Sequence, residues 1–207
     1  MAVKDSLMQP QRGRALSEIL AAKGAAVAPT AEGFAPRRRF LSSEPYCTLE
    51  LAAEEYASRG EHSRAIEEFS RAIPVSPFWA APYIHWKRGD SYSALGRYED
   101  AIADYEVPHC DDVCKDDEAR RRWRLVTLLQ ESQQPERAIR ALRELIDYCT
   151  SRIECRDGRY FYDRALARAG LKEYNKALDD CGFALEAGAR PGTINELRAA
   201  ILADSAL

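Results

Sequence analysis

The sequence has no run of apolar residues close to the roughly 20 that a helix needs to cross a bilayer, which argues against a membrane-spanning protein. It also lacks a charged start followed by an apolar stretch and a small-residue cleavage site, so we expect no secretory signal. Six cysteines among 207 residues are too few for a disulfide-stapled domain, and we expect reduced thiols in an intracellular compartment. The remaining composition, with 46% hydrophobic and 30% charged residues, is typical of a globular protein with one core.

Short motifs that would indicate an enzyme are also missing. There is no Gly-rich phosphate loop, no His-Glu-x-x-His pair and no dinucleotide fingerprint. No histidine has a nucleophile at a recognisable spacing; the three are His62, His85 and His109. Pairs of adjacent acidic residues are interpreted as solvated helix faces; they are Glu54-Glu55, Glu67-Glu68 and Asp179-Asp180. We therefore expect a protein without catalytic residues and without a cofactor.

Charge is divided unevenly along the chain. Residues 1–43 carry seven basic and three acidic side chains, a net charge of +4, whereas the whole chain has −3. The rest of the chain is therefore acidic, which argues against nucleic acid as its partner, because phosphate binding needs clustered positive charge. We expect residues 1–43 to form a basic, low-complexity arm with one helical stretch, Ala15 to Lys23, ended by Gly24.

The end of this arm leaves two cellular locations open. The stretch from Arg38 to Ser43 resembles the Arg-x-Phe-x-x-Ser pattern near the cleavage sites of mitochondrial targeting peptides, whereas Asp5 and Glu18 are unusual in such peptides. We expect an intracellular protein and favour the cytoplasm over the mitochondrion. A retained arm would give the chain a second attachment point, and the candidate residues are Arg37, Arg38, Arg39 and Phe40.

Small residues recur through the rest of the chain with a period in the mid-thirties. Four alanines are separated by 36, 37 and 39 residues; they are Ala65, Ala101, Ala138 and Ala177. Twelve residues before each alanine lies another anchor, which we call the first anchor of its unit, at Ala53, Gly89, Val126 and Ala165; the alanine is the second anchor. Since small residues let paired helices approach closely, the repetition predicts four helical hairpins that stack on one another.

This pattern resembles the tetratricopeptide repeat family, whose unit is a helix–turn–helix of about 34 residues. The resemblance implies an all-α, right-handed solenoid over residues 44–207, with units at 46–79, 82–115, 119–152 and 158–191. A capping helix is expected at 193–204, with Thr193 as its N-cap. Because Pro108 cannot continue a helix interior, the helix that starts at Tyr98 should end near Glu106.

Members of this family bind peptide segments in a concave groove lined by the first helix of each unit, so the resemblance implies protein partners. Residues three before the first anchor should face that groove; they are Glu50, Trp86, Trp123 and Tyr162. With neighbouring basic side chains, the predicted partner-binding set is Trp86, Lys87, Arg120, Trp123, Arg124, Arg159 and Tyr162. The alternative is that the aromatics pack between helices and that Arg120 to Arg124 form a solvated helix face.

The same frame can be compared with co-chaperones that hold the C-terminal carboxylate of heat-shock chaperones. Arg120 and Arg124 match one cationic pair of that clamp, but Glu50 and Glu54 would repel a carboxylate, so we expect no such clamp. The resemblance favours a non-enzymatic interaction scaffold or adaptor that is a structural subunit of a larger assembly. The alternative is a soluble co-chaperone or assembly factor that binds transiently.

Four cysteines fall in or beside loops that should emerge at the same end of the stack; they are Cys110, Cys114, Cys149 and Cys155. Only Cys110 and Cys114 have the short spacing that is usual in zinc sites. We therefore predict free thiols and no metal, with a four-cysteine metal site or a disulfide as alternatives. Cys181 lies four residues after Ala177, where the first two units have an aromatic residue, and it should be a small buried hydrophobic residue.

Overall fold

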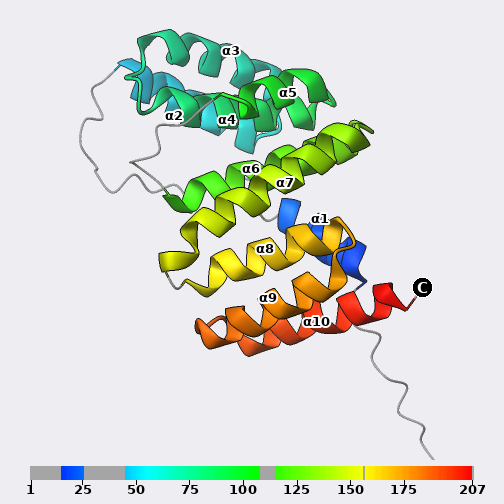
Figure 1. The fold of residues 1–207 in the computed structure, drawn as a ribbon. Coiled ribbons are helices and arrows are strands. Elements are labelled where there is room, and N and C mark those ends of the chain that lie inside the picture. The colour runs from blue at the N-terminus through cyan, green and yellow to red at the C-terminus, as the bar shows by residue number, and fades with distance from the viewer. Residues whose placement is uncertain (1–14, 26–44, 108–114, 156, 207) are drawn as a thin grey trace, which may run out of the picture.

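The computed structural model describes residues 15–25, 45–107, 115–155 and 157–206. In these ranges the chain is helical and contains no strand, and its helices stack as a solenoid (Figure 1). The helices are α1 (Leu16–Ala25), α2 (Pro45–Ser58), α3 (His62–Ala72), α4 (Ala81–Ala94), α5 (Tyr98–Tyr105), α6 (Lys115–Glu131), α7 (Pro135–Arg152), α8 (Gly158–Gly170), α9 (Tyr174–Glu186) and α10 (Pro191–Ser205). Short 3₁₀ turns follow α3 at Ile73–Val75 and α7 at Ile153–Cys155.

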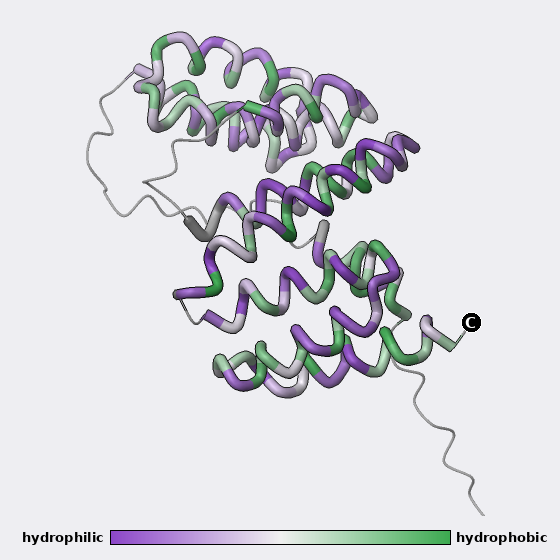
Figure 2. Tube along the Cα trace, viewed as in Figure 1, coloured by the Kyte–Doolittle hydropathy of each residue, from purple (hydrophilic) through white to green (hydrophobic). Residues whose placement is uncertain are grey.

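Helices α2 to α9 form four consecutive hairpins, and each hairpin packs against the next one along the chain (Figure 1). The pairs are α2/α3, α4/α5, α6/α7 and α8/α9, and α10 packs on α9 at the C-terminal end. This order confirms the all-α repeat solenoid that the recurring small residues predict. Apolar and polar residues follow one another along the helices (Figure 2), as expected when each helix buries part of its surface against its neighbours.

The small anchors lie where the two helices of a hairpin meet. Ala53, Ala65 and Ala101 have no exposed surface. At Gly89 an added Cβ would lie 2.9 Å from Cδ2 of Tyr105 and 3.3 Å from the carbonyl oxygen of Ala101. A larger residue at this position would therefore push α4 and α5 apart, which explains the glycine in the second unit.

The turn inside each hairpin has one residue in the left-handed region of the backbone, five positions before the second anchor of the unit. It is glycine in the first two units, where Gly60 and Gly96 have φ of 79° and 71°. In the last two units Gln133 and Lys172 occupy the same place with φ of 58° and 61°. Because the turn conformation persists without the glycine, the hairpin is set by the packing of its helices as well as by the turn residue.

The ends of two helices test the sequence analysis directly. Helix α5 ends at Tyr105, with Glu106 as its C-cap, as the proline at position 108 indicates. Helix α10 starts at Pro191 after Arg190 as N-cap, so the prediction of Thr193 as N-cap is wrong. Proline is favoured in the first turn of a helix because its missing N–H leaves no hydrogen bond unmade there. The predicted apolar stripe of α10 is buried, with Ile194, Leu197 and Ile201 in the core.

Helix α1 belongs to the N-terminal arm and packs against α6, α8 and α10. These helices are the first members of the third and fourth units and the capping helix, so α1 lies on one side of the solenoid rather than extending the stack (Figure 1). The candidate docking residues Arg37, Arg38, Arg39 and Phe40 lie outside the described residues. No helix within the described ranges is both long enough and apolar enough to cross a membrane.

Candidate protein-binding surface

The first helices α2, α4, α6 and α8, together with α10, form what we call the first-helix face. On α4 and α6 the predicted aromatic positions are almost completely buried, since Trp86 is 4% and Trp123 is 2% exposed. Both indoles belong to the hydrophobic core, and Tyr83 contacts Trp86 edge-on with ring centroids 5.0 Å apart. Tyr162 on α8 is half-buried. The two tryptophans therefore lie below the surface of this face, and their contact with a partner stays a prediction.

Above the indoles, successive first helices are joined by ion pairs. The ammonium group of Lys87 on α4 lies 2.6 Å from Oε1 of Glu50 on α2 and also contacts Glu54. One unit further on, Nε of Arg124 on α6 lies 3.2 Å from Oδ1 of Asp90 on α4. Lys87 and Arg124 each lie two residues before the first anchor, so the pairs form a ladder with one cation per unit.

Burial and charge have opposite effects on the pKa values along this ladder. Burial alone would lower the pKa of Lys87, but Glu50 and Glu54 outweigh it and raise this pKa. For Asp90, burial dominates over Arg124 and raises the carboxyl pKa. Lys87 and Arg124 are thus both paired with carboxylates of the chain itself, and the absence of a chaperone carboxylate clamp stays a prediction.

In the fourth unit the equivalent position carries a negative charge instead of a positive one. There the position two before the anchor is Asp163, a buried carboxylate on α8. Its partner comes from the arm, since Nζ of Lys23 lies 2.6 Å from Oδ1 of Asp163. The same ammonium group lies 5.5 Å from the centre of the Tyr162 ring, within range of a cation–π interaction.

The arginine-rich start of α6 is held largely by contacts inside the protein. The side chain of Arg121 is buried and donates to the backbone carbonyl of Tyr105 and to Glu118. Arg122 pairs with Glu118 at 2.7 Å and lies over the Tyr148 ring. The interpretation of Arg120 to Arg124 as a solvated face is therefore wrong for Arg121, because its position on α6 points it into the junction with α5.

Beside Tyr162 the first-helix face opens into a cleft of about 450 Å³ between the N-terminal ends of α8 and α10. Arg159, which is exposed, and Asp157 line this cleft. Asp157 caps α8 by accepting a hydrogen bond from the backbone N–H of Arg159, and it also binds that residue's guanidinium group at 2.6 Å. The cleft therefore brings together two of the predicted binding residues, Arg159 and Tyr162.

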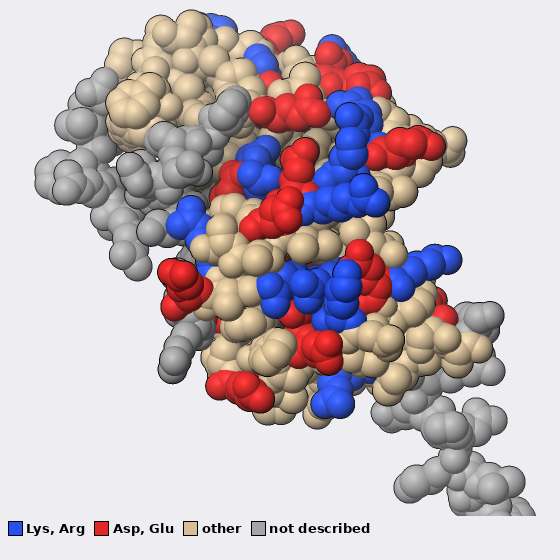
Figure 3. Space-filling model, viewed as in Figure 1, with Lys and Arg blue, Asp and Glu red and all other residues tan. Residues whose placement is uncertain are grey.

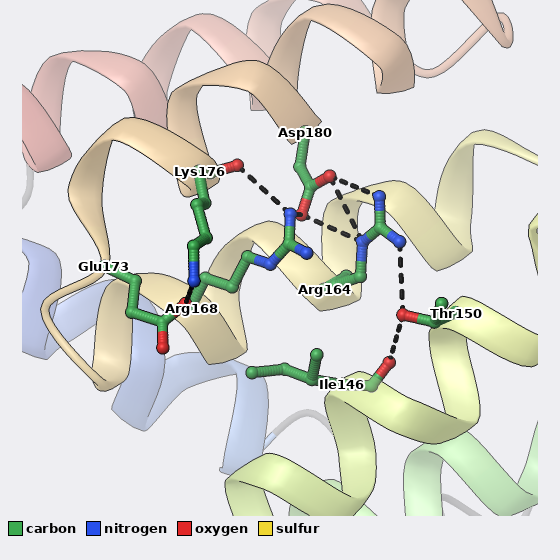
Figure 4. Close-up of polar contacts among 7 residues, drawn as sticks. All are labelled: Ile146, Thr150, Arg164, Arg168, Glu173, Lys176 and Asp180. Atoms are coloured by element: carbon green, nitrogen blue, oxygen red, sulfur yellow. Dashed lines mark hydrogen bonds and ion pairs between the residues drawn. The ribbon is translucent and has the colours of Figure 1, made fainter.

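Two buried carboxylates on the second helices were missed by the sequence analysis. Asp180 on α9 has no exposed surface and is held by Arg164 at 2.6 Å and by Arg168 at 2.8 Å (Figure 4). Arg164 also donates to Oγ1 of Thr150 on α7, which joins the fourth unit to the third. The assignment of Asp179-Asp180 as a solvated pair is thus wrong for Asp180, while Asp179 is exposed.

The second unit contains the same arrangement. Asp104 on α5 accepts hydrogen bonds from Arg88 at 2.7 and 2.8 Å and lies 2.7 Å from Nδ1 of His85. In both units an arginine one residue before the first anchor pairs with an aspartate three residues after the second anchor. This recurring spacing is present in the sequence and could have identified both pairs.

Of the four cysteines considered as metal ligands, Cys149 has a side chain that the structure describes. Cys149 is buried in α7, and burial raises the pKa of its thiol to about 12, which disfavours the thiolate that binds metals. Cys110 and Cys114 lie outside the described residues, as does the side chain of Cys155. Within the described part of the chain, no group of three His, Cys, Asp or Glu residues is placed to hold an ion. Cys181 is fully buried in the core, as its place in the repeat predicts.

A known family model matches one unit of the repeat pattern. Residues 82–106 match the family model described as tetratricopeptide repeat. No curated protein matches the chain significantly.

Similar solved structures include YrrB, described as a TPR protein with an unusual peptide-binding site, with 17% identity, 80% of each chain covered and a TM-score of 0.49. MamA from Desulfovibrio magneticus RS-1 has 16% identity and a TM-score of 0.49, with 77% of this chain and 86% of that one covered. The Sgt2 TPR domain from Aspergillus fumigatus has 18% identity and a TM-score of 0.29, with 86% and 83% covered. The matched repeat at residues 82–106 corresponds to the second of the four stacked hairpins, α4/α5.

Proposed function

We propose that the chain is a non-enzymatic docking scaffold, a structural subunit of a larger assembly, which binds a segment of a partner protein on its first-helix face. The position of α1 is the observation that carries this proposal. Its side chains Leu16 and Ile19 are 5% and 6% exposed where the helix packs on the body. A face that buries one short helix of its own chain has the shape and apolar surface to take a helical segment of another protein.

Charge on the face favours a partner segment that also carries carboxylates. Arg120 and Arg159 occupy equivalent positions, six residues before the first anchor of the third and fourth units, and their separation repeats with the units. Guanidinium groups recognise carboxylates by paired hydrogen bonds. On the face seen in Figure 3, acidic and basic side chains of the described residues are interspersed, whereas nucleic acid binding needs clustered positive charge.

Charge reversal provides the test, because changes at the buried indoles would also disturb the core. A full-length chain with Arg120→Glu and Arg159→Glu should lose most of its partner from affinity capture and should leave the large complex on a native gel. The matched control is Arg140→Glu with Arg143→Glu, which makes the same change in charge on exposed positions of α7. Equal capture by both variants, with helical content unchanged, would contradict the proposal.

The same native gel distinguishes a transient assembly factor from a permanent structural subunit. A structural subunit should migrate almost entirely with the large complex, whereas an assembly factor should migrate near the mass of the free chain, 23.3 kDa. We favour the subunit, since the arm and the first-helix face provide two attachments on one chain, and two linked contacts raise the effective concentration of each.

A further inference from the structure

Helix α1 packs three apolar side chains, Leu16, Ile19 and Leu20, against the body of the protein. Leu16, Ile19 and Leu20 follow the i, i+3, i+4 spacing that places side chains on one side of a helix. Leu16 and Ile19 are buried and Leu20 packs against the core, whereas Ser17 and Glu18 on the other side are exposed. This is the pattern by which an amphipathic helix binds a groove of another protein.

The first-helix face supplies a specific partner for the next turn of α1. Lys23, at i+7, reaches Asp163 at 2.6 Å and lies over Tyr162. In the second and third units the equivalent position is a cation, Lys87 or Arg124, that is already paired within the body. In the fourth unit this position is instead the carboxylate of Asp163, which is buried with α1 in place, and burying a charge without a counter-ion is costly. This part of the face therefore favours an added helix that supplies a cation.

Helix α1 is also short enough to be exchanged. Isolated helices below about 12 residues are marginal in water, and α1 has ten residues. Its stability therefore comes from the contacts with α6, α8 and α10, which are made on one side only. A tethered segment of this kind acts as an intramolecular ligand, and it multiplies the apparent affinity of any competitor by the fraction of time for which the site is free.

We propose that α1 is an exchangeable, built-in ligand of the surface formed by α6, α8 and α10, and that it is displaced by a partner helix of the same chemistry. That chemistry is apolar side chains at i, i+3 and i+4 with a lysine or arginine at i+7. The inference rests on the proposed function, because it names the kind of helix that the first-helix face selects and the segment that regulates access to it.

A peptide with the sequence of residues 14–26, labelled with a fluorophore, tests the exchange without any partner protein. Fluorescence anisotropy measures how tightly the peptide binds to the full-length chain and to a full-length variant with Leu16→Glu and Ile19→Glu, in which α1 is released. We expect the variant to bind the peptide at least tenfold more tightly than the wild type. A peptide with Lys23→Glu should lose most of this affinity, since it places like charge beside Asp163.

Peptide variants provide the matched control. Leu16→Glu in the peptide puts a charge on the buried side and should abolish binding, whereas Ser17→Glu puts the same charge on the exposed side and should leave it unchanged. Equal affinity of the peptide for wild type and released chain, or no binding to a released chain that keeps its circular dichroism spectrum, would overturn the proposal. If the released chain loses its helical signal, a Lys23→Glu chain that retains both apolar residues replaces it, with the same expected order of affinities.

The two proposals can fail separately. If Arg120→Glu with Arg159→Glu leaves partner capture intact, the proposed function is contradicted whatever the peptide does. If the peptide does not discriminate between wild type and released chain while that charge reversal abolishes capture, the face is a docking site and α1 is a permanent part of the fold.

Discussion

At the scale of single residues, Asp180 shows how a repeat protein uses a charge inside its stack. The carboxylate binds two arginines of α8, and one of these reaches Thr150 in the preceding unit. An interior of low dielectric strengthens such contacts but penalises any group left without a partner. Removing Asp180 should therefore cost more stability than removing a surface charge, because two guanidinium groups would lose their partner.

We expect Asp180→Asn to lower the free energy of unfolding by about 3 kcal/mol, the magnitude typical of breaking a buried ion pair. The neighbouring substitution Asp179→Asn is the matched control, because Asp179 is exposed and surface changes stay within about 0.5 kcal/mol. Urea unfolding followed by circular dichroism measures both values. Similar losses from the two variants would show that the Asp180 contacts contribute little.

Asp104 makes the stability of the second unit dependent on pH. Burial alone would raise the pKa of Asp104, but Arg88 and His85 outweigh burial and hold this pKa below its ordinary value of 3.8. A carboxyl group with a lowered pKa stabilises the fold above its unfolded pKa, and this contribution is lost as pH falls through the folded value.

In Asp104→Asn the group that titrates is gone. The wild type should be more stable than the variant at about pH 5, and this advantage should shrink as the pH is lowered below about 4. Thermal unfolding of both proteins across that range measures the difference. An advantage that stays constant down to about pH 2 would mean that the carboxylate is not the group responsible.

At the scale of helices, the anchors carry most of the information that the sequence offers. Their spacing predicts the number and order of the hairpins, because helix contact demands a small residue wherever two helices cross closely. The start of α10 could not be placed as well, since Pro191 and Thr193 are both good starting residues and only packing decides between them. Arg121 was missed because its partner is a backbone carbonyl at the end of α5, which no side-chain pattern reveals.

Two glycines in helices test whether close contact or conformational freedom matters more. Gly89→Ala would place a Cβ 2.9 Å from Tyr105, and we expect a loss of about 1–3 kcal/mol, as for other overpacked cores. At Gly182 in α9 an added Cβ meets nothing within 4 Å, so Gly182→Ala should raise stability by about 0.5–1 kcal/mol through its higher helix propensity. Chemical denaturation compares the two, and equal effects would contradict the role of Gly89 at the crossing.

At the scale of the whole molecule, the repeat frame predicts the stack but not what lies on it. The arm shares no repeat with the body, so its docking depends on Leu16, Ile19 and Lys23 finding a surface that only the assembled units create. The aromatic positions were correctly placed on first helices, yet Trp86 and Trp123 are buried by their neighbours. Exposure depends on the size of surrounding side chains, and the frame alone does not specify it.

Site-specific photo-crosslinking tests the central claim, that the first-helix face is the docking surface. A photoreactive amino acid replaces Arg120 on α6 or, as a control, Arg143 on the exposed side of α7, and cross-links formed in cells are mapped by mass spectrometry. The scaffold account predicts that position 120 cross-links to one partner segment with the chemistry described for α1 and that position 143 does not. Equal cross-linking of that partner at both positions, or at 143 alone, would contradict it.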